Sequence, residues 1–170
     1  MSLVINRLII ATVATMLLIA GCSHSHSQSK AEKLSADKLP PQIMAAINGR
    51  FPGATVTSAE KENEDGKIVY DIELKQGGRK YEMDIHDDGT VIEIEKEYDV
   101  SKLSAAATKT ITDKYPGCSI KEVMEVNKVD GKKETPDHYE VTLETADKKT
   151  HEVILSLDGK MAKSEPEEKK

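Results

Sequence analysis

LPPQIMAAINGRFPGATV, residues 39–56, sets the architecture of this chain, because the same pattern returns at 103–120 as LSAAATKTITDKYPGCSI. In both stretches an apolar or small residue recurs at every fourth position, which predicts one face of an amphipathic helix. An aromatic-Pro-Gly triplet then predicts the end of each helix, since Pro disfavours the α conformation in the residue before it and Gly permits a turn. The two stripes are Leu39, Ile43, Ile47 and Phe51, and Leu103, Ala107, Ile111 and Tyr115.

The repeat continues beyond the helices. YDIEL (70–74) matches YEVTL (139–143), and YEMDIHDDG (81–89) matches HEVILSLDG (151–159), at offsets of 69 and 70 rather than 64. We place the extra five or six residues of the second copy in a loop, GKKETPDH (131–138), because insertions in loops cost little free energy. The chain therefore contains two copies of one unit.

Strict alternation of apolar and polar residues after each helix predicts antiparallel strands with one face toward the helix and one toward water. Asp-Gly and Gly-Gly pairs separate the strands, as tight hairpin turns require. HDDGT (86–90) lacks the ligand spacing of a calcium loop, so we interpret it as a hairpin turn. Each unit is predicted to be a helix packed on a roughly four-stranded antiparallel sheet, which is an α+β fold.

This plan resembles the PepSY-like family, also described as beta-lactamase-inhibitor-like. The resemblance covers about residues 36 to 161 and depends on the paired helices, the FPG and YPG turns and the Asp-Gly hairpins. It implies a non-enzymatic, extracytoplasmic module that binds or inhibits another protein, with peptidases or cell-wall enzymes as possible targets. No inhibitory loop can be transferred to this sequence residue by residue.

The amino-terminal region predicts export and lipid anchoring. Residues 8–20 are apolar or small and follow Arg7, and a helix of that length reaches about 20 Å, less than the roughly 30 Å of a bilayer core. They suit a secretion signal, and Ile19-Ala20-Gly21-Cys22 resembles a bacterial lipobox, with cleavage before a lipidated Cys22. The alternative is a short uncleaved anchor with an incidental cysteine. The membrane is thus a predicted partner, with the folded part facing the periplasm or the cell exterior.

Composition limits the partners further. Removal of residues 1–21 leaves 23 basic and 30 acidic residues, a formal charge of 23 − 30 = −7, which opposes nucleic-acid binding. Residues 23–38 lack an apolar stripe, so we predict a flexible tether, in which His24 and His26 belong to a solvated spacer rather than a metal site. The predicted divisions are a signal peptide (1–21), lipidated Cys and tether (22–38), unit 1 (39–98), unit 2 (99–161) and a disordered tail (162–170).

The sequence favours a non-catalytic protein without a cofactor. It contains no zinc-protease helix motif, no nucleophile elbow and no phosphate-binding loop. His151 shares the inward parity of Tyr81, so we interpret it as a partly buried sheet residue, and His86 as a weak candidate base. Cys118 corresponds to Ala54 and is better explained as a small residue in a packed turn than as a nucleophile.

The candidate partner-binding residues are acidic and alternate with the apolar residues of unit 1. The corresponding positions of unit 2 are less uniform. We expect these side chains to point away from the helix and to bind a protein with a basic patch. The alternatives are a cation- or metal-binding role for the same face, a merely solvated surface, or a binding site in the loops or at the junction of the units. The candidates are Asp71, Glu73, Glu82, Asp84, Glu93 and Glu95.

Overall fold

The computed structural model describes residues 31–64 and 66–164. These residues form two α-helices, two short 3-10 helices and nine strands. The first half contains β1 (Glu32–Lys33), η1 (Ala36–Lys38), α1 (Pro41–Arg50), β2 (Thr55–Glu64), β3 (Lys67–Gln76), β4 (Arg79–His86) and β5 (Val91–Glu97). The second half contains η2 (Val100–Lys102), α2 (Ala105–Lys114), β6 (Ser119–Asp130), β7 (Lys133–Glu144), β8 (Thr150–Ser156) and β9 (Met161–Ser164).

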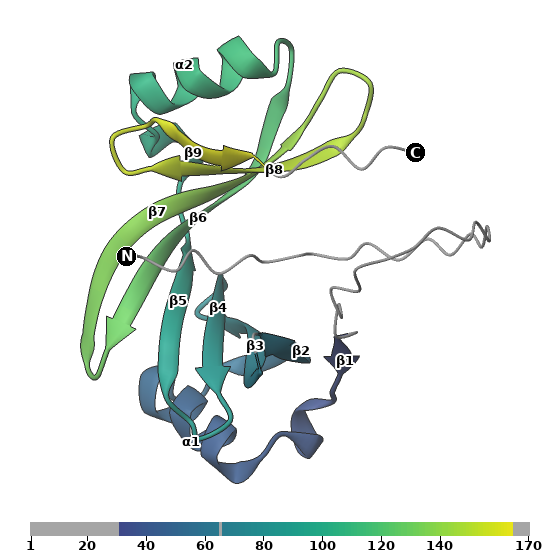
Figure 1. Ribbon diagram of the computed structural model, residues 1–170, viewed down its shortest axis with the longest axis vertical. Helices are drawn as coiled ribbons and strands as arrows, with labels where there is room; N and C mark the ends of the chain where they lie inside the picture. Colours follow the sequence, from purple (N-terminus) through teal and green to yellow (C-terminus); the bar gives the residue numbers. More distant parts are fainter. Residues whose placement is uncertain (1–30, 65, 165–170) are drawn as a thin grey trace, which may run out of the picture.

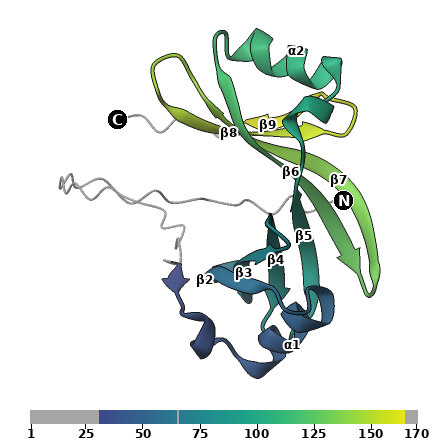
Figure 2. The same cartoon turned by 180° about the vertical axis from the view of Figure 1, so that it is seen from behind.

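All nine strands form one antiparallel sheet in sequence order. The sequence predicted a separate sheet in each unit, but β5 pairs with β6, from Glu93–Lys128 to Glu97–Met124, and joins the halves. Figures 1 and 2 show that the sheet curves between α1 at one end of the molecule and α2 at the other, so that the two helices lie outside the curve. None of the helices in residues 31–64 and 66–164 lies on the opposite, inner face of the sheet, which we call the helix-free face.

Each helix covers its own apolar core. In the first half, Ile43 and Ile47 of α1 pack with apolar residues of β3, β4 and β5, among them Ile72 and Met83. In the second half, Ala107 and Ile111 of α2 pack with residues of β6, β7 and β8, and the cluster is smaller. The predicted helical stripes are therefore the buried faces, as the four-residue spacing requires.

Both helices end where the aromatic-Pro-Gly triplets predict. Phe51 and Tyr115 are the C-caps of α1 and α2, and Gly53 and Gly117 adopt positive φ. The tips of the β4–β5 and β8–β9 hairpins then approach the first turns of the helices. A Cβ atom on Gly159 would lie 2.6 Å from the Ala107 nitrogen, and one on Gly89 would lie 3.1 Å from the Gln42 carbonyl oxygen. The hairpin tips therefore approach the helices closely, and the Gln42 side chain donates to the Asp87 carbonyl and the Thr110 hydroxyl to the Gly159 carbonyl.

Three predicted boundaries are wrong. The tether does not extend to residue 38, because β1 pairs with β2 and η1 follows it. The tail does not begin at residue 162, because β9 runs to Ser164 and pairs with β8. The insertion GKKETPDH is not a loop: after a turn at Gly131 and Lys132, its residues continue as β7. In all three cases backbone pairing with a neighbouring strand, which sequence periodicity does not report, orders the segment.

Candidate functional site

The six predicted acidic residues lie together on the helix-free face of β3, β4 and β5. Strand register places Asp71 opposite Asp84, and Asp84 opposite Glu93, which forms one row across three strands. It likewise places Glu73 opposite Glu82, and Glu82 opposite Glu95, which forms a second row. Like charges directly opposite each other destabilise a sheet by roughly 0.2–1 kcal/mol per pair. We call these two rows the carboxylate rows.

Two residues that the sequence did not single out complete the first row. Glu60 of β2 pairs with Asp71, and Lys128 of β6 pairs with Glu93, to which its amino group forms an ion pair. Alternation within each strand could predict which face these side chains share. It could not predict which residues of β2 and β6 stand beside the row, because that depends on strand register.

The carboxylate rows are less solvated than the sequence predicted. Asp84, Glu93 and Glu95 are only 3%, 4% and 2% exposed, and Glu82 is 9% exposed. The prediction of water-facing side chains is therefore wrong for these four residues, whereas Asp71 and Glu73 are half-buried. The physical reason is that the side chains on the inner face of a curved, twisted sheet converge and shield one another from water.

One lysine stands at the end of the second row. The amino group of Lys80 lies 2.9 Å from a Glu82 carboxylate oxygen and 3.2 Å from a Glu122 oxygen of β6. Burial alone would lower the pKa of Lys80, but the charges and hydrogen bonds of Glu82 and Glu122 outweigh it and raise the pKa well above its ordinary value. Lys80 therefore stays protonated and offsets part of the negative charge at this edge of the rows.

The same face of the second half has a different chemistry. Met124 and Val126 of β6 lie there, opposite Glu140 and His138 of β7, and both apolar residues are buried outside the two helix-covered cores. Ile154 of β8 stands opposite Glu140. The carboxylate rows thus end at β6, where apolar side chains begin.

His138 is held between carboxylates. Its Nδ1 lies 2.9 Å from an Asp137 oxygen and its Nε2 lies 3.4 Å from a Glu140 oxygen. Burial opposes protonation, but the hydrogen bonds to Glu140 and Asp137, with the charges of Glu140 and Glu93, raise the pKa of the imidazole above its ordinary value. Sequence patterns did not indicate His138, because it lies in the segment that was expected to be a loop.

Of the candidate catalytic residues, His86 belongs to the first half, whereas Cys118 and His151 belong to the second. His151 is half-buried and its ring lies 5.3 Å from that of Tyr115, as expected of a sheet histidine. Cys118 is half-buried and packs against the core of the second half, and His86 is half-buried at the end of β4. Within residues 31–64 and 66–164, no group of three or more His, Cys, Asp or Glu side chains has a geometry that could hold a metal ion.

The predicted lipidation site Cys22 and the histidines His24 and His26 lie outside the described residues. In the part of the chain that the structure describes, neither helix has the length and apolar character needed to cross a bilayer. Membrane anchoring through Cys22 therefore stays a prediction from the sequence.

The fold is shared with solved structures of low sequence identity. A BLIP-like protein from Bacteroides fragilis has 18% identity and a TM-score of 0.52, with 78% of this chain and 90% of that chain covered. A DUF2874 family protein from Bacteroides uniformis has 13% identity and a TM-score of 0.55, with 74% and 88% covered. A Bacteroides eggerthii protein proposed to be periplasmic has 10% identity and a TM-score of 0.56, with 74% and 87% covered. A search of curated proteins gave no match.

Two family models match the chain. Residues 40–95 match the peptidase propeptide and YPEB domain, PepSY, which covers α1 and β2 to β5. Residues 69–163 match the beta-lactamase-inhibitor-like, PepSY-like model, which covers more than half of the 170 residues and extends across both halves of the sheet. The chain therefore belongs to the PepSY-like, beta-lactamase-inhibitor-like family.

Proposed function

We propose that this protein is a non-catalytic binding module that receives a cationic segment of another extracytoplasmic protein on its helix-free face. The observation that carries the proposal is the pair of carboxylate rows across β3, β4 and β5. A folded sheet has no structural need for carboxylates directly opposite one another, since such pairs cost stability. Negative charge predominates on this face, with Lys80 and Lys128 at its edges. A surface on which one sign of charge predominates raises the rate at which an oppositely charged partner arrives.

Family membership supports a binding role and suggests the class of partner. The descriptions of the two matching family models name a peptidase propeptide and a beta-lactamase inhibitor. The partner we propose is a peptidase or a cell-wall enzyme with a basic patch beside its active site. Such an enzyme fits both the family descriptions and the negative charge of this face. Binding there would inhibit the enzyme by covering that patch.

The location of the protein is part of the proposal. The lipobox-like Ile19-Ala20-Gly21-Cys22 and the relative proposed to be periplasmic together favour export, with the mature chain anchored through lipid on Cys22. In cells, Cys22→Ala should leave the protein unprocessed or release it from the membrane fraction. Mass spectrometry that finds an unmodified Cys22 in a chain cleaved elsewhere would contradict the anchoring.

A capture experiment with matched variants tests the binding role. Immobilised wild-type protein is compared with a face variant, D71N/E73Q/E82Q/D84N, and with a control, E32Q/D37N/D87N/D113N. The control removes four charges from exposed residues elsewhere in the chain and has the same net charge as the face variant. Proteins captured from the envelope fraction are then purified and titrated individually against all three forms at low and high salt.

The proposal predicts that one captured protein binds the wild type and the control equally and binds the face variant at least tenfold more weakly, a difference of about 1.4 kcal/mol. Its affinity for the wild type should fall as salt rises, because ionic screening shortens the reach of surface charges to about 8–10 Å near physiological ionic strength. Equal binding to all three forms at every salt concentration would contradict it and would direct the search to the β6–β7 hairpin.

A further inference from the structure

The β6–β7 hairpin is longer than the β2–β3 hairpin at the corresponding place in the first half. Its strands have 12 residues each, whereas β2 and β3 have 10 each. The hairpin pairs with β5 only as far as Lys128, opposite Glu93. The remaining residues, from Val129 through the turn to Glu134, extend beyond that pairing toward α1, as the arrangement of β6, β7 and α1 in Figure 1 shows.

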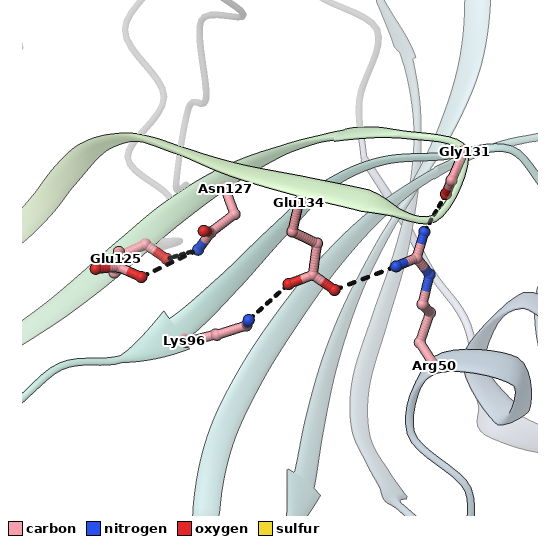
Figure 3. Close-up of polar contacts among 6 residues, drawn as sticks. All are labelled: Arg50, Lys96, Glu125, Asn127, Gly131 and Glu134. Carbon is pink, nitrogen blue, oxygen red and sulfur yellow. Dashed lines mark hydrogen bonds and ion pairs between the residues drawn. The ribbon is translucent and has the colours of Figure 1, made fainter.

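The tip of this hairpin is attached to the first half by side chains. Arg50, the last residue of α1, lies with its Nη1 3.1 Å from an Oε1 of Glu134, and its other guanidinium nitrogen donates to the Gly131 carbonyl. Lys96 of β5 places its Nζ 2.6 Å from the second carboxylate oxygen of Glu134. Figure 3 shows Glu134 between these two cations, with Arg50 reaching the turn at Gly131. We call this set of contacts the latch.

The latch is partly shielded from water and is supported by apolar packing. The side chains of Arg50 and Glu134 are 19% and 26% exposed, so their attraction is screened less than that of a fully exposed pair. Val129, opposite Glu134 in the hairpin, packs against the core of the first half. A residue of the second repeat is therefore part of the hydrophobic cluster built by the first.

The contacts at the hairpin tip have a mechanical consequence. The twist between neighbouring strands varies among sheets, by roughly −10 to −35°, so pairing of β5 with β6 does not by itself fix one angle between the halves. The latch connects the hairpin tip to the end of α1, in addition to the ladder and the Lys80–Glu122 ion pair. A further connection at the hairpin tip restricts the angle between the halves more than the ladder and that ion pair alone.

We propose that the β6–β7 hairpin is a strap that sets the curvature of the sheet, with Glu134 as the residue that fastens it to Arg50 and Lys96. The strap therefore controls the width of the helix-free face, and this consequence rests on the proposed function of that face. Loss of the latch contacts widens the range of curvatures that the sheet adopts. It therefore lowers the affinity for a partner that fits the curvature of the latched protein. Arg50, Lys96 and Glu134 are positioning residues that need not touch the partner.

The test measures the separation of the helices in the absence of any partner. Spin labels are placed at the exposed positions Ala45 of α1 and Thr108 of α2, as Ala45→Cys and Thr108→Cys, in the full chain with Cys22→Ser and Cys118→Ala. Pulsed electron paramagnetic resonance then gives the distribution of distances between them. Three forms are compared in this background: the otherwise unchanged chain, Glu134→Gln and Glu144→Gln.

Glu144→Gln is the matched control. Glu144 also lies on β7 and also contacts two lysines, Lys121 at 3.4 Å and Lys148 at 2.9 Å, but all three residues belong to the second half. The strap predicts a broadened and shifted distribution for Glu134→Gln and an unchanged one for Glu144→Gln. Arg50→Gln, which opens the latch from α1, should reproduce the broadening and replaces Glu134→Gln if that variant does not fold.

Unchanged distance distributions for Glu134→Gln and Arg50→Gln, or equal broadening of the distribution by Glu144→Gln, would overturn the proposal that the hairpin sets the curvature. Either result would leave the proposed function intact, because the face variant used in the capture experiment retains the latch. Conversely, a broadened distribution together with failed capture would keep the strap and reject the proposed docking face.

Discussion

The β2–β3 and β6–β7 hairpins each follow the α-helix of their own half, but they contact different parts of the molecule. The β2–β3 hairpin stays within the first half, where its turn is fixed locally by Asn63, which accepts a hydrogen bond from the Gly66 backbone. The β6–β7 hairpin joins β5 on one side and reaches the end of α1 with its tip. The longer hairpin thus connects the two halves, whereas the shorter one makes its turn contact locally.

The comparison also shows how a sheet accommodates an insertion. A shift of one residue in a strand turns every later side chain to the opposite face. In β7, Val126 is opposite His138 and Asn127 is opposite Pro136, so Asp137 is the extra residue of a bulge. Pro136 lies at this irregular point, where a missing backbone donor is tolerated. The bulge restores the alternation that places Val141 and Leu143 in the core.

The largest expected effect compares the two cores. Ile47→Asp and Ile111→Asp each bury an unpaired carboxylate at a position that is 1% or less exposed, which should cost about 3–5 kcal/mol of unfolding free energy. Because one sheet joins the halves, urea unfolding followed by circular dichroism should show a single destabilised transition for either variant. Ala45→Asp and Thr108→Asp, at exposed positions of the same helices, are the controls. Wild-type stability of either core variant would contradict the packing of that helix.

A smaller effect compares the two hairpin tips that contact the helices. Gly159→Ala combines a positive φ of 82° with a Cβ 2.6 Å from the Ala107 nitrogen, so strain and overpacking should together cost about 2–4 kcal/mol. Gly89→Ala has a similar φ of 88° but a nearest contact of 3.1 Å, and should cost about 1–2 kcal/mol. Thermal unfolding of both variants measures the difference in stability. An equal loss of stability would show that Gly159 packs no more tightly against α2 than Gly89 does against α1.

The smallest expected effect is a pH dependence confined to the second half. His138 has a folded-state pKa raised above its ordinary value of about 6.5, while its counterpart in the first repeat, Val69, does not titrate. The raised pKa means that protonation stabilises the fold. This contribution is complete below about pH 6.5 and is lost as the pH rises through the folded-state pKa.

The comparison of wild type with His138→Gln measures that contribution. The difference between their unfolding free energies should shrink as the pH is raised from about 5.5 to 8.5. The groups around His138 are Asp137 and Glu140 on β7, Glu93 on β5 and the uncharged Val126 and Ser156 on the neighbouring strands. A difference that stays constant over this range would show that the imidazole does not change its charge there.

Sequence patterns predicted the elements well because the information is local. The spacing of Ile43 and Ile47 identifies the buried helix face, and the alternation from Ile68 to Leu74 identifies the buried strand face. The same alternation placed six carboxylates on the opposite face, and the register brings them into rows. These features depend on the helix period of 3.6 residues and the strand period of 2 residues, which the sequence displays directly.

The remaining features depend on contacts between distant segments. Pairing of β5 with β6 crosses the predicted unit boundary at residues 98 and 99, and the contact of Arg50 with Glu134 spans 84 residues. Neither leaves a periodic signal. The low exposure of Asp84 and Glu95 follows from the curvature of the sheet, which a pattern within one strand does not contain.

The most direct test of the central claim maps where a cationic chain binds. An isotope-labelled sample of the protein is titrated with a soluble lysine-rich peptide, and amide shifts are followed by nuclear magnetic resonance at low and physiological salt. The account predicts that the largest shifts fall on β3, β4 and β5 around the carboxylate rows and that they are lost in D71N/E73Q/E82Q/D84N but retained in E32Q/D37N/D87N/D113N. Shifts spread evenly over exposed acidic residues, or centred on the β6–β7 hairpin and unchanged in the face variant, would contradict it.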